Sequence, residues 1–337
     1  MIIEQQDADH FLNFLNKEET SAKITGYAKN RTPFLFFIDA TMENGLVYSP
    51  VEAAKKGIFF NFNGITNFTL ESLAPVRKEF SFTPVPFDEY HASFRKVMAH
   101  IKKGDTYLLN LTFPTPVETG YSLEEIFHFS VAPYKLLVNE HFVLFSPEIF
   151  IKIHEGRIFS HPMKGTINAS IPGAEELLMN DRKELFEHNT IVDLIRNDLA
   201  MVSTHVKVSR FRYLQKITTN RKALLQVSSE ITGELPADYL SHLGDIIFTL
   251  LPAGSVTGAP KLKTVEIIRN AEIDDRGFYT GICGFFDGHS LDSAVMIRFI
   301  EKNDRGLFFR SGGGITALSN AQSEYHELTD KVYVPFI

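Results

Sequence analysis

Lys164 stands in a short run of residues that could hold an amine in one position. The run is HPMKGT (161–166). Pro162 has a restricted φ angle, and Gly165 permits a turn that a larger residue would resist. An amine held at a rigid corner suits a nucleophile, provided that it can reach its neutral form. The same run also fits a surface lysine in a turn, so the motif alone leaves both interpretations open.

Two predicted helices carry pairs of glutamates that could bind a metal ion. Glu184 and Glu187 are three residues apart, as are Glu324 and Glu327, and Lys331 follows Glu324 at i+7. These spacings put the side chains on one helix face. If the two pairs converge, they form an all-oxygen site that favours Mg²⁺. The alternative is two solvated helix faces with local ion pairs, such as Glu327 with Lys331.

Two further charged residues lie in apolar segments. Glu148 is the acid of FSPEIF (145–150), where burial would raise its pKa and suit a general acid or base. Arg298 ends the apolar run AVMIR (294–298) and could bind a carboxylate through two hydrogen bonds. An exposed glutamate at the start of a strand and a strand-end arginine facing water are the alternatives.

Two glycine-rich segments could approach a ligand with their backbone. LPAGSVTGAPK (251–261) precedes a predicted helix, but it departs from the phosphate-loop pattern because two residues separate Gly258 from Lys261. Its backbone N–H groups could still bind a carboxylate. The second segment, SGGGI (311–315), follows a predicted strand, and its glycines allow either close approach to a ligand or a tight turn.

The elements that must position these groups alternate without a regular βαβ rhythm. We predict strands at Tyr107–Thr112, Phe142–Phe145, Ile149–His154, Gly281–Phe286, Ser293–Phe299 and Gly306–Ser311. We predict helices at Asp88–Lys102, Ala174–Asn197, Leu240–Leu250, Pro260–Asn270 and Gln322–Tyr333. This order favours an α+β fold with antiparallel sheets flanked by helices. A proline-containing break at SFTPVPF (81–87) predicts a short N-terminal portion, residues 1–87, packed on a main domain at 88–337.

Composition excludes several classes of function. The 337 residues carry a net charge of −7, which argues against binding to nucleic acid or an anionic membrane. The single cysteine, Cys283, excludes an intramolecular disulfide and a multi-cysteine metal site. The N-terminus lacks the basic start and apolar run of a signal peptide, so we expect a cytoplasmic protein.

As a set, seven segments resemble the chorismate-utilising enzymes, the family of anthranilate, aminodeoxychorismate, isochorismate and salicylate synthases. In chain order they are GDTYLLNLT (104–112), FSPEIF (145–150), HPMKGT (161–166), KELFEHNTIVDLIRNDL (183–199), LPAGSVTGAPKLKTVEIIR (251–269), RGFYTGICGFF (276–286) and SGGGITALSNAQSEYHELTDK (311–331). The resemblance implies the family's single large α+β domain at 88–337 and a Mg²⁺-dependent reaction on chorismate.

The resemblance also implies roles for individual residues. Glu187 and Glu327 resemble direct Mg²⁺ ligands, with Glu184 and Glu324 beside them, partly through water. Glu148 matches the acid/base carboxylate that assists departure of the C4 hydroxyl. The positions that match substrate-binding residues are Thr166, Tyr279, Arg298, Gly312, Gly313, Gly314 and Lys331.

Two positions bear on the branch of the family. Leu108 stands where the isochorismate and salicylate branches have a water-activating lysine and the nitrogen-using branches usually have glutamine. Lys164 matches aminodeoxychorismate synthases, whereas anthranilate synthases usually have alanine. The implied chemistry is attack of Lys164 on C2 as the C4 hydroxyl leaves, followed by ammonia at C4, giving 4-amino-4-deoxychorismate for p-aminobenzoate and folate. Without the lysine, ammonia attacks C2 on the route to anthranilate.

Ammonia is expected from a separate glutamine amidotransferase, because Cys283 lies in an apolar strand rather than in a nucleophile setting. Gln226 replaces the family's usual histidine, which weakens a proton-transfer role there. Leu70-Glu71-Ser72 only faintly resembles a tryptophan-sensing segment, so we expect no amino-acid feedback. Two alternatives stay open: an anthranilate synthase large subunit with an unusual lysine, and a degenerate chorismate-binding subunit without activity.

Overall fold

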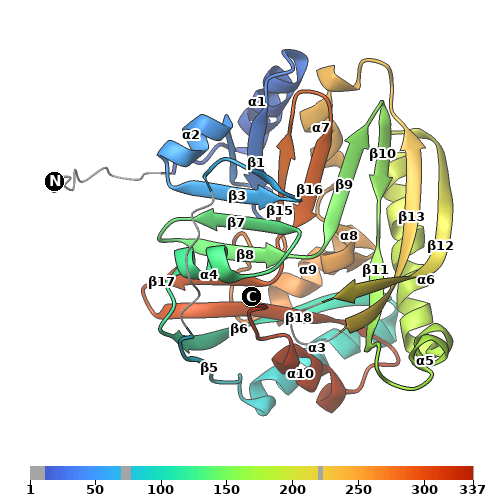
Figure 1. Cartoon of the computed structure of the whole chain (residues 1–337). Helices are drawn as coiled ribbons and strands as arrows, with labels where there is room; N and C mark the ends of the chain where they lie inside the picture. Colours follow the sequence, from blue (N-terminus) through green and yellow to red (C-terminus); the bar gives the residue numbers. More distant parts are fainter. Residues whose placement is uncertain (1–11, 70–76, 219–222, 337) are drawn as a thin grey trace.

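Two antiparallel sheets form the framework of the computed structural model, which describes residues 12–69, 77–218 and 223–336. Their strands run across each other in Figure 1. In spatial order, sheet A contains β11 (Met163–Asn168), β13 (Ala223–Glu234), β10 (Arg157–Ser160), β9 (Ile149–His154), β16 (Leu291–Val295), β15 (Ile282–Phe286), β1 (Phe34–Ile38) and β2 (Gly45–Tyr48), with β12 (Thr204–Thr218) paired to β13.

Sheet B lies beside sheet A and carries the segments nearest the chain's C-terminus (Figure 1). In spatial order it contains β14 (Gly258–Ala259), β6 (Leu108–Thr119), β18 (Gly306–Thr316), β17 (Phe299–Asn303), β8 (Phe142–Ser146), β7 (Tyr134–Val138), β3 (Ile58–Phe62) and β4 (Ile65–Thr66), with β5 (Phe80–Phe82) paired to β6.

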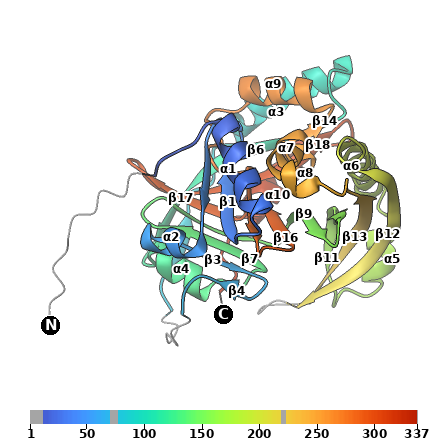
Figure 2. The ribbon, with the colours of Figure 1, turned by 90° about the horizontal axis from the view of Figure 1, so that it is seen from above.

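Helices cover the outer surfaces of the two sheets, as the view from above shows (Figure 2). Helix α1 packs on α7, and α3 packs on α9. The helices are α1 (Lys17–Lys29), α2 (Pro50–Lys55), α3 (Phe87–Lys103), α4 (Leu123–Phe129), α5 (Ala174–Asn180), α6 (Arg182–Ala200), α7 (Leu243–Leu250), α8 (Gly254–Thr257), α9 (Lys261–Ala271) and α10 (Ala321–Asp330), with a 3₁₀ turn at Tyr239–Ser241.

Strand β1 shows why this sequence builds a layered core. All five of its residues, FLFFI, are buried. Phe34, Phe36 and Ile38 belong to a hydrophobic cluster with α1 and α7. Leu35 and Phe37 point the other way, into a cluster shared with strands of sheet B. A strand buried on both faces carries a continuous apolar run, because alternate side chains enter two different cores.

The α+β fold expected from the sequence is confirmed, with several local corrections. The helix predicted at Leu240–Leu250 begins at Leu243 after a 3₁₀ turn, and the helix predicted at Gln322–Tyr333 ends at Asp330. The helix predicted at 174–197 is two helices, because Asp181 ends α5 and caps the start of α6. The strand predicted at Ser293–Phe299 ends at Val295, and β17 begins at Phe299. The three glycines at 312–314 form no turn, since they lie inside β18 and pair with β6.

The N-terminal portion contributes strands to both sheets: β1 and β2 to sheet A, and β3, β4 and β5 to sheet B. The boundary at residue 87 stays a prediction. Leu70-Glu71-Ser72 lies outside the described residues. Within the described ranges, no helix is both long and apolar enough to cross a membrane.

Candidate active site

A cavity of about 120 Å³ collects most of the residues that the sequence singled out. Sheet B supplies its floor through β18, α10 supplies one wall, and β11 supplies another. Of the expected residues, the following line it: Glu148, Lys164, Tyr279, Arg298, Gly312, Gly313, Gly314, Glu327 and Lys331. Residues as far apart in the sequence as Glu148 and Lys331 therefore meet at one place.

The two glutamate pairs converge on each other from α6 and α10. Asp181 starts α6 by accepting a hydrogen bond from the Glu184 backbone at 2.9 Å. The α10 N-cap, Asn320, accepts from two backbone N–H groups of its first turn. Glu187 and Glu324 are 5% and 2% exposed, so their carboxylates are buried rather than solvated. The interpretation as solvated helix faces is therefore wrong for Glu187 and Glu324, whereas the side chain of Glu327 is 42% exposed.

Lysines neutralise this carboxylate cluster. Lys183 lies 2.7 Å from Glu324 and 3.7 Å from Glu187, and so connects the two helices. Burial alone would lower the pKa of Lys183, but its hydrogen bond to Glu324 and the neighbouring carboxylates raise that pKa above its usual range. Burial raises the pKa of Glu187, against the opposing effect of nearby lysines. The pair of Lys331 with Glu327 forms at 2.8 Å, as expected from their i,i+4 spacing.

The glycines of β18 make room for these charged groups. A Cβ on Gly314 would lie 3.2 Å from Oε2 of Glu187 and 3.6 Å from Nζ of Lys164. A Cβ on Gly313 would lie 3.6 Å from Oε1 of Glu327. The approach at Gly314 is tight and explains why that position lacks a side chain, whereas the distance at Gly313 is an ordinary van der Waals contact.

The donor set suits a hard divalent cation, although the carboxylates are not gathered around one point. Oε1 of Glu187 and Oε2 of Glu324 are buried and have no hydrogen-bond partner among the described residues. Buried carboxylate oxygens without partners are costly unless something binds them. In the same ranges, no three acidic, histidine or cysteine side chains stand close enough to hold a metal. Lys183 lies between the carboxylates instead.

Glu148 approaches the cavity from the corner between β8 and β9. Its carboxylate accepts a short hydrogen bond from the Ser255 hydroxyl of α8. Burial raises the pKa of Glu148, and the Ser255 hydrogen bond and the positive charges of Lys164 and Lys331 oppose that rise. A carboxyl group with a raised pKa is suited to donate a proton near neutral pH. Sequence analysis missed Ser255, although it lies within the LPAGSVTGAPK segment.

Lys164 lies at an irregularity of β11 rather than in a turn. The register of β11 against β13 shifts between Lys164 and Thr166, and Gly165 has a φ of +76°. The expected backbone freedom of Gly165 is therefore used, and the Lys164 side chain is 19% exposed with Nζ 3.6 Å from Oε2 of Glu187. Thr166 pairs opposite Gln226 and is exposed, and it is not among the residues that line the cavity.

Arg298 occupies the break between β16 and β17, with a φ of +52°. Its guanidinium donates to the Lys331 carbonyl at 2.6 Å and stacks 4.7 Å above the ring of Tyr333. Tyr279 is 3% exposed at the same cavity, and burial raises the pKa of its hydroxyl. Together they place one cation and one phenol in the lining of the cavity.

The LPAGSVTGAPK segment packs against neighbouring elements and also contributes residues to the lining of the cavity. Lys261 forms a buried ion pair with Asp198 of α6 at 2.6 Å and also donates to the Leu250 carbonyl. A Cβ on Gly258 would collide with the backbone of Leu108. Lys261 therefore ties this loop to α6, while Ser255 and Val256 reach the cavity.

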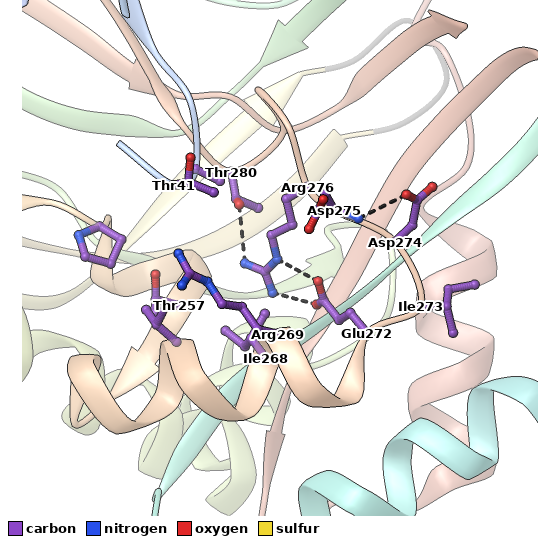
Figure 3. A pocket seen from close by; sticks show the side chains of 13 residues that line it. Thr41, Thr257, Ile268, Arg269, Glu272, Ile273, Asp274, Asp275, Arg276 and Thr280 are labelled. Atoms are coloured by element: carbon purple, nitrogen blue, oxygen red, sulfur yellow. Dashed lines mark hydrogen bonds and ion pairs between the residues drawn. The ribbon is translucent and has the colours of Figure 1, made fainter. Parts of the chain in front are cut away.

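A larger cavity of about 320 Å³ lies beside the start of β15 (Figure 3). Its wall contains Arg276, which is bound to Glu272 through two hydrogen bonds and to Thr280 through another (Figure 3). None of the residues predicted to act in catalysis or binding lines it. Because its buried charges are already paired with each other, we place the chemistry in the smaller cavity.

Comparison with known proteins decides the family. The family model for chorismate binding enzymes matches residues 65–336. The chain belongs to the chorismate-binding enzyme family. An uncharacterized PabA-like protein of Haemophilus influenzae is 52% identical over 309 residues, which cover 92% of this chain and 94% of that protein.

Two more distantly related proteins are similar in sequence or in fold. Aminodeoxychorismate synthase component 1 of Salmonella typhimurium is 34% identical over 72% of this chain, which spans only 56% of that longer protein. The fold resembles that of a putative 2,3-dihydroxybenzoate-specific isochorismate synthase from Bacillus anthracis, with a TM-score of 0.69 at 22% identity over 94% of this chain and 86% of that one.

Proposed function

We propose that this chain is the chorismate-aminating subunit of an aminodeoxychorismate synthase. The observation that carries the proposal is that Lys164 and Glu148 line one cavity, so that an amine and a carboxyl group with a raised pKa face the same space. The likeness to the Salmonella protein supports the same activity. Anthranilate synthase remains the competing assignment within the family.

The proposed reaction has two displacement steps. The neutral amine of Lys164 attacks C2 of chorismate, both conjugated ring double bonds shift, and the C4 hydroxyl leaves as water with a proton from Glu148, which regains one proton from the amine. Ammonia then attacks C4 and gives up a proton, both double bonds shift back, and the Lys164 nitrogen takes up a proton as it leaves C2. The net change is chorismate plus ammonia giving 4-amino-4-deoxychorismate plus water, so atoms and charge balance.

Mg²⁺ is the cofactor we propose, held by Glu187 and Glu327 with Glu184 and Glu324 beside them. The unpartnered buried oxygens of Glu187 and Glu324 support this assignment. When bound, the ion would neutralise and orient the ring carboxylate of the substrate. Arg298 and Tyr279 are the residues we propose to bind the other carboxylate, and their position in the lining of the cavity supports this role.

A glutamine amidotransferase is the proposed source of ammonia. Cys283, the only cysteine of the 337 residues, is fully buried in β15, where burial raises the pKa of its thiol. A buried neutral thiol cannot hydrolyse glutamine. The word "component" in the name of the Salmonella relative fits an enzyme made of more than one chain.

The deciding experiment supplies chorismate, an ammonium salt and Mg²⁺ to the purified chain and identifies the product by liquid chromatography and mass spectrometry. We expect 4-amino-4-deoxychorismate, and no product when a chelator replaces Mg²⁺. Fluorescent anthranilate would instead assign the chain to the competing activity. Absence of any amination would favour a non-catalytic chorismate-binding subunit.

A further inference from the structure

Lys183 has an unusual position for a lysine in the first turn of a helix. Its Nζ lies 2.7 Å from Oε1 of Glu324, 3.7 Å from Oε1 of Glu187 and 3.9 Å from Oε2 of Glu327. One ammonium thus contacts three carboxylates that come from α6 and α10. The other two lysines of the cluster each contact a single carboxylate, Lys164 with Glu187 and Lys331 with Glu327.

The Lys183 ammonium supplies hydrogen-bond partners to only some of the carboxylate oxygens in this cluster. Oε1 of Glu187 and Oε2 of Glu324 keep no hydrogen-bond partner within the described part of the chain, although both are buried. A lysine brings one positive charge and three donors, whereas a divalent cation brings two charges and accepts up to six or more oxygen ligands. The cluster therefore has unused capacity for a cation of higher charge.

The Lys183 side chain is also able to move out of the carboxylate cluster into solvent. It belongs to the N-terminal turn of α6, where the helix dipole disfavours a positive charge. Its side chain remains 30% exposed, so its flexible stem has a path to solvent. The carboxylates themselves hold the ammonium in place, because among the described residues no other side chain forms a hydrogen bond or ion pair with it.

We propose that Lys183 is an internal competitor for the metal ion and sets the metal affinity of the site. Its ammonium occupies the position among Glu187, Glu324 and Glu327, and it withdraws to solvent when a divalent cation binds there. The proposal rests on the metal dependence in the proposed function. It assigns to Lys183 a role in metal binding that is separate from the chemistry of chorismate.

The test measures Mn²⁺ binding to the intact chain without chorismate, by calorimetry and by the paramagnetic resonance signal of free Mn²⁺. Replacing a charge-assisted hydrogen bond removes a competing interaction, so Lys183→Met should bind Mn²⁺ about tenfold or more tightly than wild type. Lys183→Arg retains the charge and should gain no affinity. Lys302→Met is the matched control, because it removes an exposed lysine paired with Glu140 outside the cluster.

A second measurement uses the unaltered protein, so it holds even if a variant folds poorly. Acetylation of amines, read by peptide mass spectrometry, should label Lys183 faster when Mn²⁺ saturates the protein, with Lys302 as the internal reference. Equal Mn²⁺ affinity of wild type and Lys183→Met, or metal-independent labelling of Lys183, would overturn the inference while leaving the metal site intact. Failure of both chains to bind Mn²⁺ would overturn the metal assignment and the inference together.

Discussion

Nζ of Lys164 lies 3.6 Å from Oε2 of Glu187, so the proposed nucleophile and a proposed metal ligand are direct neighbours. At this distance the two side chains form an ion pair. In the proposed mechanism the same Lys164 amine attacks C2 of chorismate. The other groups that contact the Glu187 carboxylate therefore also influence where this amine lies.

Lys164→Ala should redirect amination. The variant keeps Glu148 and the carboxylate cluster but lacks the amine, so formation of 4-amino-4-deoxychorismate should fall by about 100-fold or more. Ammonia can then attack C2, and C2-aminated product should become detectable by mass spectrometry. An Lys302→Ala control should retain the wild-type product, and an unchanged rate for Lys164→Ala would exclude the covalent step.

The adduct itself can be sought by intact-mass measurement. Wild type incubated with chorismate and Mg²⁺, but without ammonia, should gain the mass of chorismate less one water. Peptide mapping should locate the addition at Lys164, and Lys164→Ala should show none. A wild-type chain that aminates chorismate yet never shows the adduct would favour direct attack by ammonia.

Glu148 should govern the pH dependence of the reaction. Its raised pKa keeps the acid form present to higher pH than for an ordinary glutamate, and the rate should fall as pH rises through that pKa. Glu148→Gln should lower kcat/KM by about 10²–10⁴-fold and remove this descending limb. Profiles are compared at constant free ammonia, because ammonia itself titrates in the alkaline range.

Ser255→Ala provides the matched test of the same group. The Ser255 hydroxyl favours the ionised form of Glu148, so its loss should raise the Glu148 pKa further. The descending limb should therefore move to higher pH while the product stays the same. A limb that stays in place would show that another group controls the profile.

Gly314→Ala should damage the site without unfolding the chain. The new methyl group would lie 3.1 Å from Cδ1 of Leu108 and 3.2 Å from Oε2 of Glu187, which is tight contact in a paired strand. We expect activity to fall by about tenfold or more, with a stability loss of about 1–3 kcal/mol from overpacking. In the control Gly26→Ala, nothing lies within 4 Å of the added Cβ. Helix α1 should gain about 0.5–1 kcal/mol there, with activity unchanged.

The ion pair of Lys261 and Asp198 should matter for stability. Both side chains are largely buried, at 13% and 12% exposed. Lys261→Met leaves the Asp198 carboxylate buried without its partner and should cost about 3–5 kcal/mol in urea unfolding. The double variant Asp198→Leu/Lys261→Met should recover most of that loss. If Lys261→Met lowers the free energy of unfolding by less than the double variant does, the ion pair contributes nothing to stability.

The sequence predicts helices and strands best where a single local pattern determines the element. Strand β9 occurs at Ile149–His154 as predicted, and α3 differs from its prediction by one residue at each end. Position 181 misled the prediction because a single aspartate there both ends one helix and begins the next. Strand β12 was not predicted, although Val206, Val208, Phe211 and Tyr213 alternate with polar residues along it.

The sequence predicted which local residue groups form the site, but it did not predict the contacts between side chains from distant segments. Spacing indicates that Glu184 and Glu187 share a helix face, and Glu324 and Glu327 likewise. No local pattern reveals that Lys183 reaches from α6 to α10, because that contact joins positions 141 residues apart. The Ser255–Glu148 hydrogen bond is equally non-local, spanning 107 residues.

Strand β1 also has a consequence for how the chain acquires its structure. Phe34–Ile38 lies near the N-terminus, yet it pairs with Ile282–Phe286. Synthesis delivers these apolar residues long before their partner strand exists. Pairing between such distant segments slows folding and leaves an aggregation-prone hydrophobic segment exposed until the partner strand is made. We expect nascent chains that stop before residue 282 to depend on chaperones, and the proposed catalytic cavity to form among the last events of folding.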